Sequence, residues 1–154
     1  MAQLLCAQQD WRIGEITEYH GRTDGWGNLR CILNALFYLR PPIRYLGPGP
    51  IDFDAVVLVS PIWLMRLASP MCSFVATHRK RLPEVAVVSV MGGLGSPDAP
   101  DEVGRWIGRQ VTLSTTVTAR DAKDGGCAER MQAFGAALAP TPAAQEIARP
   151  VQFT

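Results

Sequence analysis

Short apolar runs alternate with segments of helical periodicity along this chain, and the alternation predicts a parallel α/β sheet. Two of the runs, at residues 55–59 and 85–90, are apolar at every position except Ser89. Continuous rather than alternating apolarity indicates strands buried on both faces, as between two layers of helices. Weaker strands are predicted at 11–17 and 111–118, and the threonine-rich alternation of the second suits a sheet edge.

Helices are predicted wherever apolar residues recur every three or four positions. The chain opens with what resembles the end of a helix, at residues 2–8. Four further apolar stripes follow it: Trp26 to Phe37, Met71 to His78, Val103 to Ile107 and Cys127 to Leu138. The resulting order, α-β-α-β-α-β-α-β-α, predicts one domain over residues 1–139. Residues 140–154 are rich in proline and alanine and are expected to form an extended tail.

Length and composition suit a single cytoplasmic domain. The chain has 154 residues, of which 47% are hydrophobic and 19% charged, as in ordinary globular proteins. The chain has a net charge of +1, without the excess of basic residues that is typical of nucleic-acid-binding proteins. No apolar run approaches the roughly 20 residues that cross a bilayer. The first residues also lack the basic region and the apolar region that a leader peptide requires. We therefore expect no nucleic acid and no membrane among its partners.

The cysteines and histidines give no pattern of a metal site or a disulfide framework. The four cysteines are dispersed: Cys6, Cys31, Cys72 and Cys127. A metal site needs clustered ligands, and His20 and His78 do not cluster with these cysteines. The sequence predicts reduced, mostly buried thiols, no metal and no catalytic acid, base or nucleophile.

Two segments directly follow the central strands, where open α/β sheets bind their ligands. The first, residues 60–65, offers a hydroxyl, a rigid proline and a tryptophan on which a planar ring can stack. The second, residues 91–96, has three glycines that allow a ligand to approach the backbone closely. Each segment alone is also consistent with simple packing or a turn. The predicted ligand contacts are Ser60, Pro61, Ile62, Trp63, Leu64, Met91, Gly92, Gly93, Leu94 and Gly95.

Taken together, these segments resemble the flavodoxin family, in particular small bacterial flavodoxin-like proteins with a Pro-x-Trp loop. The likeness is strongest over residues 52–110, with Asp-Phe-Asp before the strand, then Ser60-Pro61-Ile62-Trp63, a helix containing Pro70, and Met91-Gly92-Gly93. A weaker likeness reaches from about Leu4 to Leu138. The resemblance implies a flavodoxin-like three-layer sandwich that binds FMN, transfers electrons to or from a redox partner protein, or acts as a small flavin-dependent reductase. It also implies that the first loop flanks one side of the isoalloxazine ring and that the second approaches the ring's polar edge.

The sequence departs from this family at its N-terminus. Flavodoxins begin with a central strand and a Ser/Thr/Gly-rich loop that wraps the FMN phosphate, and no such run occurs before Trp11. Without that loop the phosphate loses several charge-assisted hydrogen bonds. The alternative to FMN binding is therefore a flavin-free binding or scaffold module that has kept the fold.

In the family order 2-1-3-4-5 the absent strand is internal, so its neighbours would have open edges. Three arrangements are possible: an upstream segment fills the position, the alternating tail Pro150–Thr154 fills it, or residues 11–17 pair directly with 55–60. Because an open edge invites association, a homodimer is expected.

Overall fold

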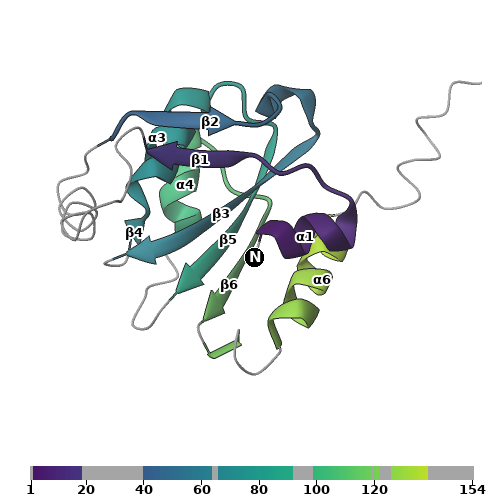
Figure 1. The fold of residues 1–154 in the computed structure, drawn as a ribbon. Coiled ribbons are helices and arrows are strands. Elements are labelled where there is room, and N and C mark those ends of the chain that lie inside the picture. The colour runs from purple at the N-terminus through teal and green to yellow at the C-terminus, as the bar shows by residue number, and fades with distance from the viewer. Residues whose placement is uncertain are drawn as a thin grey trace, which may run out of the picture.

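The computed structural model describes residues 2–18, 40–63, 66–91, 99–118, 120–121 and 126–138, which form a layered α/β fold (Figure 1). The elements in chain order are α1 (Ala2–Gln9), β1 (Glu15–Glu18), β2 (Ile43–Leu46), η1 (Pro50–Asp52), β3 (Ala55–Trp63), β4 (Arg66–Leu67), α3 (Ser69–His78), β5 (Glu84–Met91), α4 (Ala99–Ile107), β6 (Leu113–Thr118) and α6 (Gly126–Leu138). The predicted helix at 26–37 and the tail at 140–154 lie outside the described residues.

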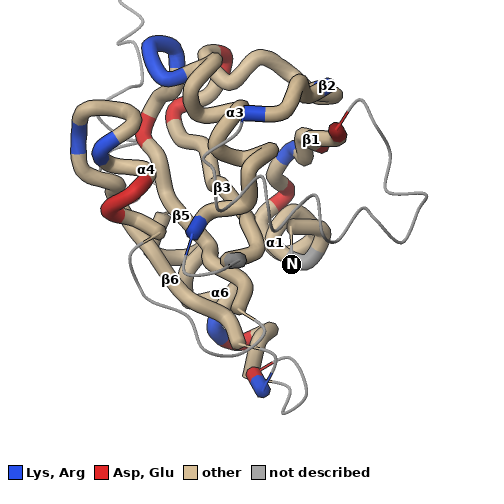
Figure 2. The backbone as a smooth tube through the Cα atoms, turned by 90° about the vertical axis from the view of Figure 1, so that its left-hand side faces the viewer, with Lys and Arg blue, Asp and Glu red and all other residues tan. Residues whose placement is uncertain are grey.

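The central sheet has four strands in the order β4-β3-β5-β6. β3 runs parallel to β5 from Ala55 opposite Glu84 to Pro61 opposite Val90, and β5 runs parallel to β6. β6 is an outer strand of this sheet, which confirms the position predicted from its alternating threonines. Neither β3 nor β6 carries a charged residue, and the only one on β5 is Glu84 at its start (Figure 2).

Alternate residues of β5 face two separate apolar cores, as expected for a strand covered on both sides. Val85 and Val87 pack on one face, together with side chains from α3 and α4. Ala86 and Val88 pack on the other, together with side chains from α1 and α6. Figure 1 shows the same division, with α3 and α4 on one side of the sheet and α1 and α6 on the other. The predicted sandwich of helices around a parallel sheet is therefore confirmed.

The first two strands form a separate antiparallel ribbon. β1 pairs with β2 from Glu15 opposite Leu46 to Glu18 opposite Ile43, and no ladder joins it to β3 in the described part of the chain. Direct pairing of residues 11–17 with 55–60, the third of the arrangements considered above, is therefore not the one adopted in the described part of the chain, where β1 pairs with β2. β2 itself was not predicted, since its four residues stand between prolines and glycines that favour a loop.

None of the helices in these described segments has the length and apolarity that spanning a membrane demands.

Candidate functional site

The first predicted loop is largely strand. β3 continues through Ser60, Pro61 and Ile62 to Trp63 and then turns back into β4, so the expectation of a loop starting at residue 60 is wrong. The extension is stabilised on both sides: Pro61 stays in register with Val90 of β5, and Ile62 pairs with Leu67 of β4. The carbonyl of Pro61 accepts the N–H of Ala68 at 3.2 Å. The segment is thus a hairpin arm held in place by hydrogen bonds. We call residues 60–63 and 66–68 the β3–β4 hairpin.

The parallel register brings the two predicted segments to the same edge of the sheet. Because Pro61 lies opposite Val90, the end of β3 and the end of β5 at Met91 are neighbours. Pro61 is exposed, Ile62 half-buried and Met91 buried. Leu64, Gly92, Gly93, Leu94 and Gly95 lie outside the described residues, as does the side chain of Trp63. The structure therefore brings together Ser60–Trp63 and Met91.

Two buried hydroxyls lie side by side just below this edge. Ser60 and Ser89 are register partners on β3 and β5, with only 1% and 2% of their surface exposed. Ser60 Oγ donates to the carbonyl of Pro61 at 3.1 Å. Ser89 Oγ has no hydrogen-bond partner among the described residues. A buried hydroxyl is normally satisfied by protein, water or ligand. Ser89 was not predicted as a site residue, although it is the one polar residue within the apolar run 85–90.

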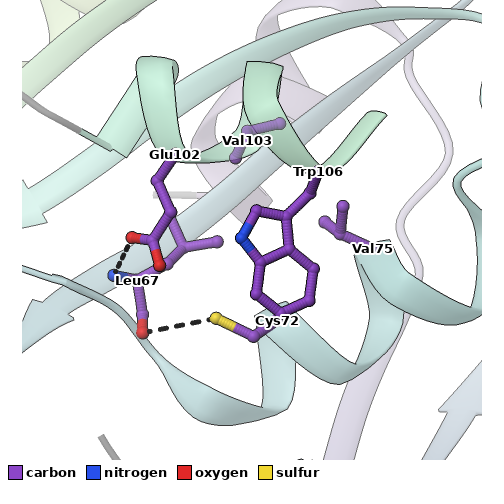
Figure 3. A pocket seen from close by; sticks show the side chains of 6 residues that line it. All are labelled: Leu67, Cys72, Val75, Glu102, Val103 and Trp106. Atoms are coloured by element: carbon purple, nitrogen blue, oxygen red, sulfur yellow. Dashed lines mark hydrogen bonds between the residues drawn. The ribbon is translucent and has the colours of Figure 1, made fainter. Parts of the chain in front are cut away.

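A recess lies behind the hairpin, between it and helices α3 and α4 (Figure 3). Even with the open solvent at its mouth included, its empty space is about 150 Å³, whereas ligand pockets usually hold roughly 300–1,000 Å³. Its lining residues are Leu67, Cys72, Val75, Glu102, Val103 and Trp106. The recess is therefore too small for a flavin ring, and its side chains support the hairpin instead.

The surroundings of the thiol in this recess favour its protonated form. Burial, and then the negative charge of Glu102, raise the pKa of Cys72 to about 12, against the smaller opposing effects of Arg40 and Arg66. A thiol with such a pKa stays protonated at neutral pH and is a poor nucleophile. None of the described cysteines forms a disulfide with another: Cys6 and Cys72 are half-buried and Cys127 is buried.

At the carboxyl end of β6, the carboxylate of Asp121 is fixed by local hydrogen bonds. Asp121 Oδ2 accepts the backbone N–H and the hydroxyl of Thr118 at 2.7 and 2.9 Å, and it lies 3.3 Å from Arg130 Nη1. The Thr118 hydrogen bonds are the main cause of the lowered pKa of Asp121. Nowhere in the described residues do three or more His, Cys, Asp or Glu side chains gather as metal ligands would.

The sequence matches no established protein family and no curated protein. Among solved structures, the chain is similar to the crystal structure of a flavoprotein in complex with FMN from Lactobacillus acidophilus NCFM. The TM-score is 0.63 at 16% identity, over 80% of this chain and 85% of that one. An NMR structure of the apo-form of the flavoprotein from the same organism gives a TM-score of 0.46 at 14% identity, over 73% and 76% of the two chains. The similarity to the crystal structure shows the fold: a mostly parallel central sheet between helices, as in an FMN flavoprotein.

Proposed function

We propose that this chain binds FMN with its isoalloxazine ring at the carboxyl ends of β3 and β5, and that it serves electron transfer. The observation that carries the proposal is the unbroken parallel register, which brings Ser60–Trp63 and Met91 to one edge of the sheet. In open α/β sheets that edge is where ligands bind. The fold shared with a protein solved in complex with FMN supports the same choice of ligand.

The described residues at this edge fit the ring of a flavin. Pro61 and Ile62 provide apolar surface for a planar heterocycle, next to the buried side chain of Met91. Ser89 Oγ, buried and without a partner among the described residues, offers a polar contact beneath it. A bound flavin would supply one- and two-electron chemistry. The chain's part is to orient the ring and exclude water, as a carrier for a cytoplasmic redox partner protein or as a small reductase.

Titration of FMN into the purified protein, followed by flavin fluorescence, tests the proposal. Quenching with a dissociation constant in the micromolar range or tighter supports it. A parallel titration with riboflavin, which has the ring without the phosphate, measures what the phosphate contributes. Equal affinities mean that the ring alone is recognised. No quenching by either compound contradicts flavin binding and favours the flavin-free binding or scaffold module.

A substitution at Trp63 tests whether its ring stacks on the flavin. Trp63→Ala is expected to weaken FMN binding by about 0.5–1.5 kcal/mol beyond the effect of lost contact area, and Trp63→Phe to restore part of the loss. Urea unfolding of both variants is the control for folding. Unchanged FMN affinity in a folded Trp63→Ala variant would remove Trp63 from the site.

We also propose that two copies of the chain associate through the free edge of β3. On the side away from β5, residues 55–60 pair with no strand in the described segments. An unpaired row of backbone donors and acceptors recruits another strand. Light scattering at micromolar concentration is expected to give a dimeric mass, and a monomeric mass would contradict this part of the proposal.

A further inference from the structure

The outer edge of the hairpin is capped by a side chain from a distant helix. β4 is an outer strand of the four-stranded sheet, and the N–H groups of adjacent residues point in opposite directions. Ala68 N–H donates inward to Pro61, whereas Leu67 N–H donates outward to Glu102 Oε2 of α4 at 3.0 Å. Figure 3 shows this carboxylate pointing at the Leu67 nitrogen. Glu102 therefore supplies the acceptor that a further strand would otherwise provide.

Glu102 occupies a position where a carboxylate is costly. Its surface is 9% exposed, and it lies in the recess among Val75, Val103 and Trp106. A charge in such surroundings is tolerated when hydrogen bonds compensate for its lost hydration. A hydrogen bond to an ionised acceptor is also shorter and stronger than one between neutral groups. The placement thus gives β4, only two residues long, a stronger tether than a neutral side chain provides.

The backbone carbonyl of Leu67 is hydrogen-bonded as well. The thiol of Cys72 on α3 donates to the Leu67 carbonyl at 3.7 Å, and the N–H of Cys72 donates to the carbonyl of Ala68 at 3.1 Å. Leu67 itself is buried in the core shared by β3, α3 and α4. The hairpin is therefore fixed to two helices through one residue, with the charge-assisted hydrogen bond on the α4 side.

We propose that Glu102 is a positioning residue for the flavin site, acting through Leu67 on the hairpin that carries Pro61, Ile62 and Trp63. This inference rests on the proposed function. Glu102 lies behind the hairpin, away from the edge where the ring would bind, so it acts by holding the arm in its binding position. Restricting the arm before the ligand arrives lowers the entropic cost of binding.

The experiment compares Glu102→Ala with Glu102→Gln, whose amide oxygen can still accept the Leu67 N–H. Asp101→Asn is the matched control, because Asp101 is exposed on the same helix. Two quantities are measured: hydrogen exchange of the Leu67 amide in the flavin-free protein, and the dissociation constants of FMN and riboflavin. Urea unfolding establishes that each variant is folded.

Glu102→Ala is expected to speed exchange of the Leu67 amide and to weaken binding of both flavins about tenfold, the loss of one charge-assisted hydrogen bond. Glu102→Gln should stay within about threefold of the unmodified chain, and Asp101→Asn should match it. Unchanged exchange at Leu67 in Glu102→Ala would overturn the tether. Faster exchange with unchanged flavin affinity would overturn the positioning role. Failure of the unmodified chain to bind either flavin would instead overturn the proposed function, while the exchange data still report on the tether.

Discussion

The rings of Tyr45 on β2 and Phe74 on α3 lie with their centroids 5.0 Å apart and their planes inclined by 52°. The Tyr45 hydroxyl donates to the carbonyl of Pro48 at 2.8 Å. A Cβ atom on Gly14 or Gly47 would collide with the Tyr45 ring, so both glycines are needed for its placement. This one side chain therefore ties the β1–β2 ribbon to the core on α3 and closes the turn after β2.

Substitution of Tyr45 is expected to separate these two roles. Tyr45→Phe keeps the ring and leaves the Pro48 carbonyl without its donor, which costs about 0.5–1.5 kcal/mol of unfolding free energy. Tyr45→Ala also removes the contact with Phe74 and leaves a cavity, which costs at least about 2 kcal/mol. Urea denaturation of the two variants measures both values. Equal losses would mean that the ring contributes nothing beyond the hydroxyl.

The position of β2 is a part of the fold that the sequence did not predict. Residues 43–46 form a strand because Ile43 and Tyr45 reach a core built by residues some thirty positions away, on α3. The central strands were predictable because their burial on both faces leaves a continuous rather than alternating apolar run in the sequence itself. A short ribbon strand carries no such local signal, and tertiary contacts decide its conformation.

His78 is expected to make stability depend on pH. Its ring lies 4.6 Å from that of Phe74, and its pKa is lowered from the ordinary 6.5 by burial and then by the charge of Arg81. In the window below pH 6.5 the unfolded chain therefore binds the proton more readily than the folded one. The contribution of the neutral His78 ring to folding stability is complete above pH 6.5. It is lost as the pH falls from 6.5 through the lower pKa of His78 in the folded chain.

Melting temperatures of the unmodified chain and of His78→Gln, recorded between about pH 8 and pH 5, test this dependence. The unmodified chain should lose more stability on acidification, because glutamine takes up no proton. His20 is present in both proteins, so its titration cancels in the comparison. Parallel curves for the two proteins would show that His78 does not contribute.

Asp121 is expected to act in the same direction as His78, but at lower pH. The Thr118 N–H and hydroxyl lower its pKa from 3.8 by donating to the carboxylate. Its stabilising contribution is therefore present above pH 3.8 and is lost as the pH falls through the folded pKa. Asp121→Asn should flatten the acid limb of the stability curve, and Thr118→Val, which removes one of the two donors, should flatten it partly. An unchanged acid limb in Asp121→Asn would contradict the assignment.

The candidate site was partly predictable, because the rule that ligands bind at the carboxyl ends of parallel strands needs only the strands themselves. The sequence thus led to Ser60–Trp63 and Met91, which the structure brings together. It did not predict that residues 60–63 form a hairpin arm, because the pairing with Arg66 and Leu67 depends on a turn with no strong sequence signal. Nor did it predict Glu102, which is far from Leu67 in sequence and reads locally as an acidic residue of a helix's first turn.

Gly108 provides a test of backbone conformation without side-chain contacts. Its φ of +73° places it in the left-handed region directly after α4, and a Cβ atom there would meet nothing within 4 Å. Its N–H donates to the carbonyl of Gly104 at 2.9 Å, which completes the last turn of the helix. Gly108→Ala should therefore cost about 1–2 kcal/mol through backbone strain alone. Gly108→Asn should cost less, since asparagine tolerates this conformation better than other non-glycine residues. Urea denaturation measures the two losses, and because no packing changes, equal costs for alanine and asparagine would contradict strain as the cause.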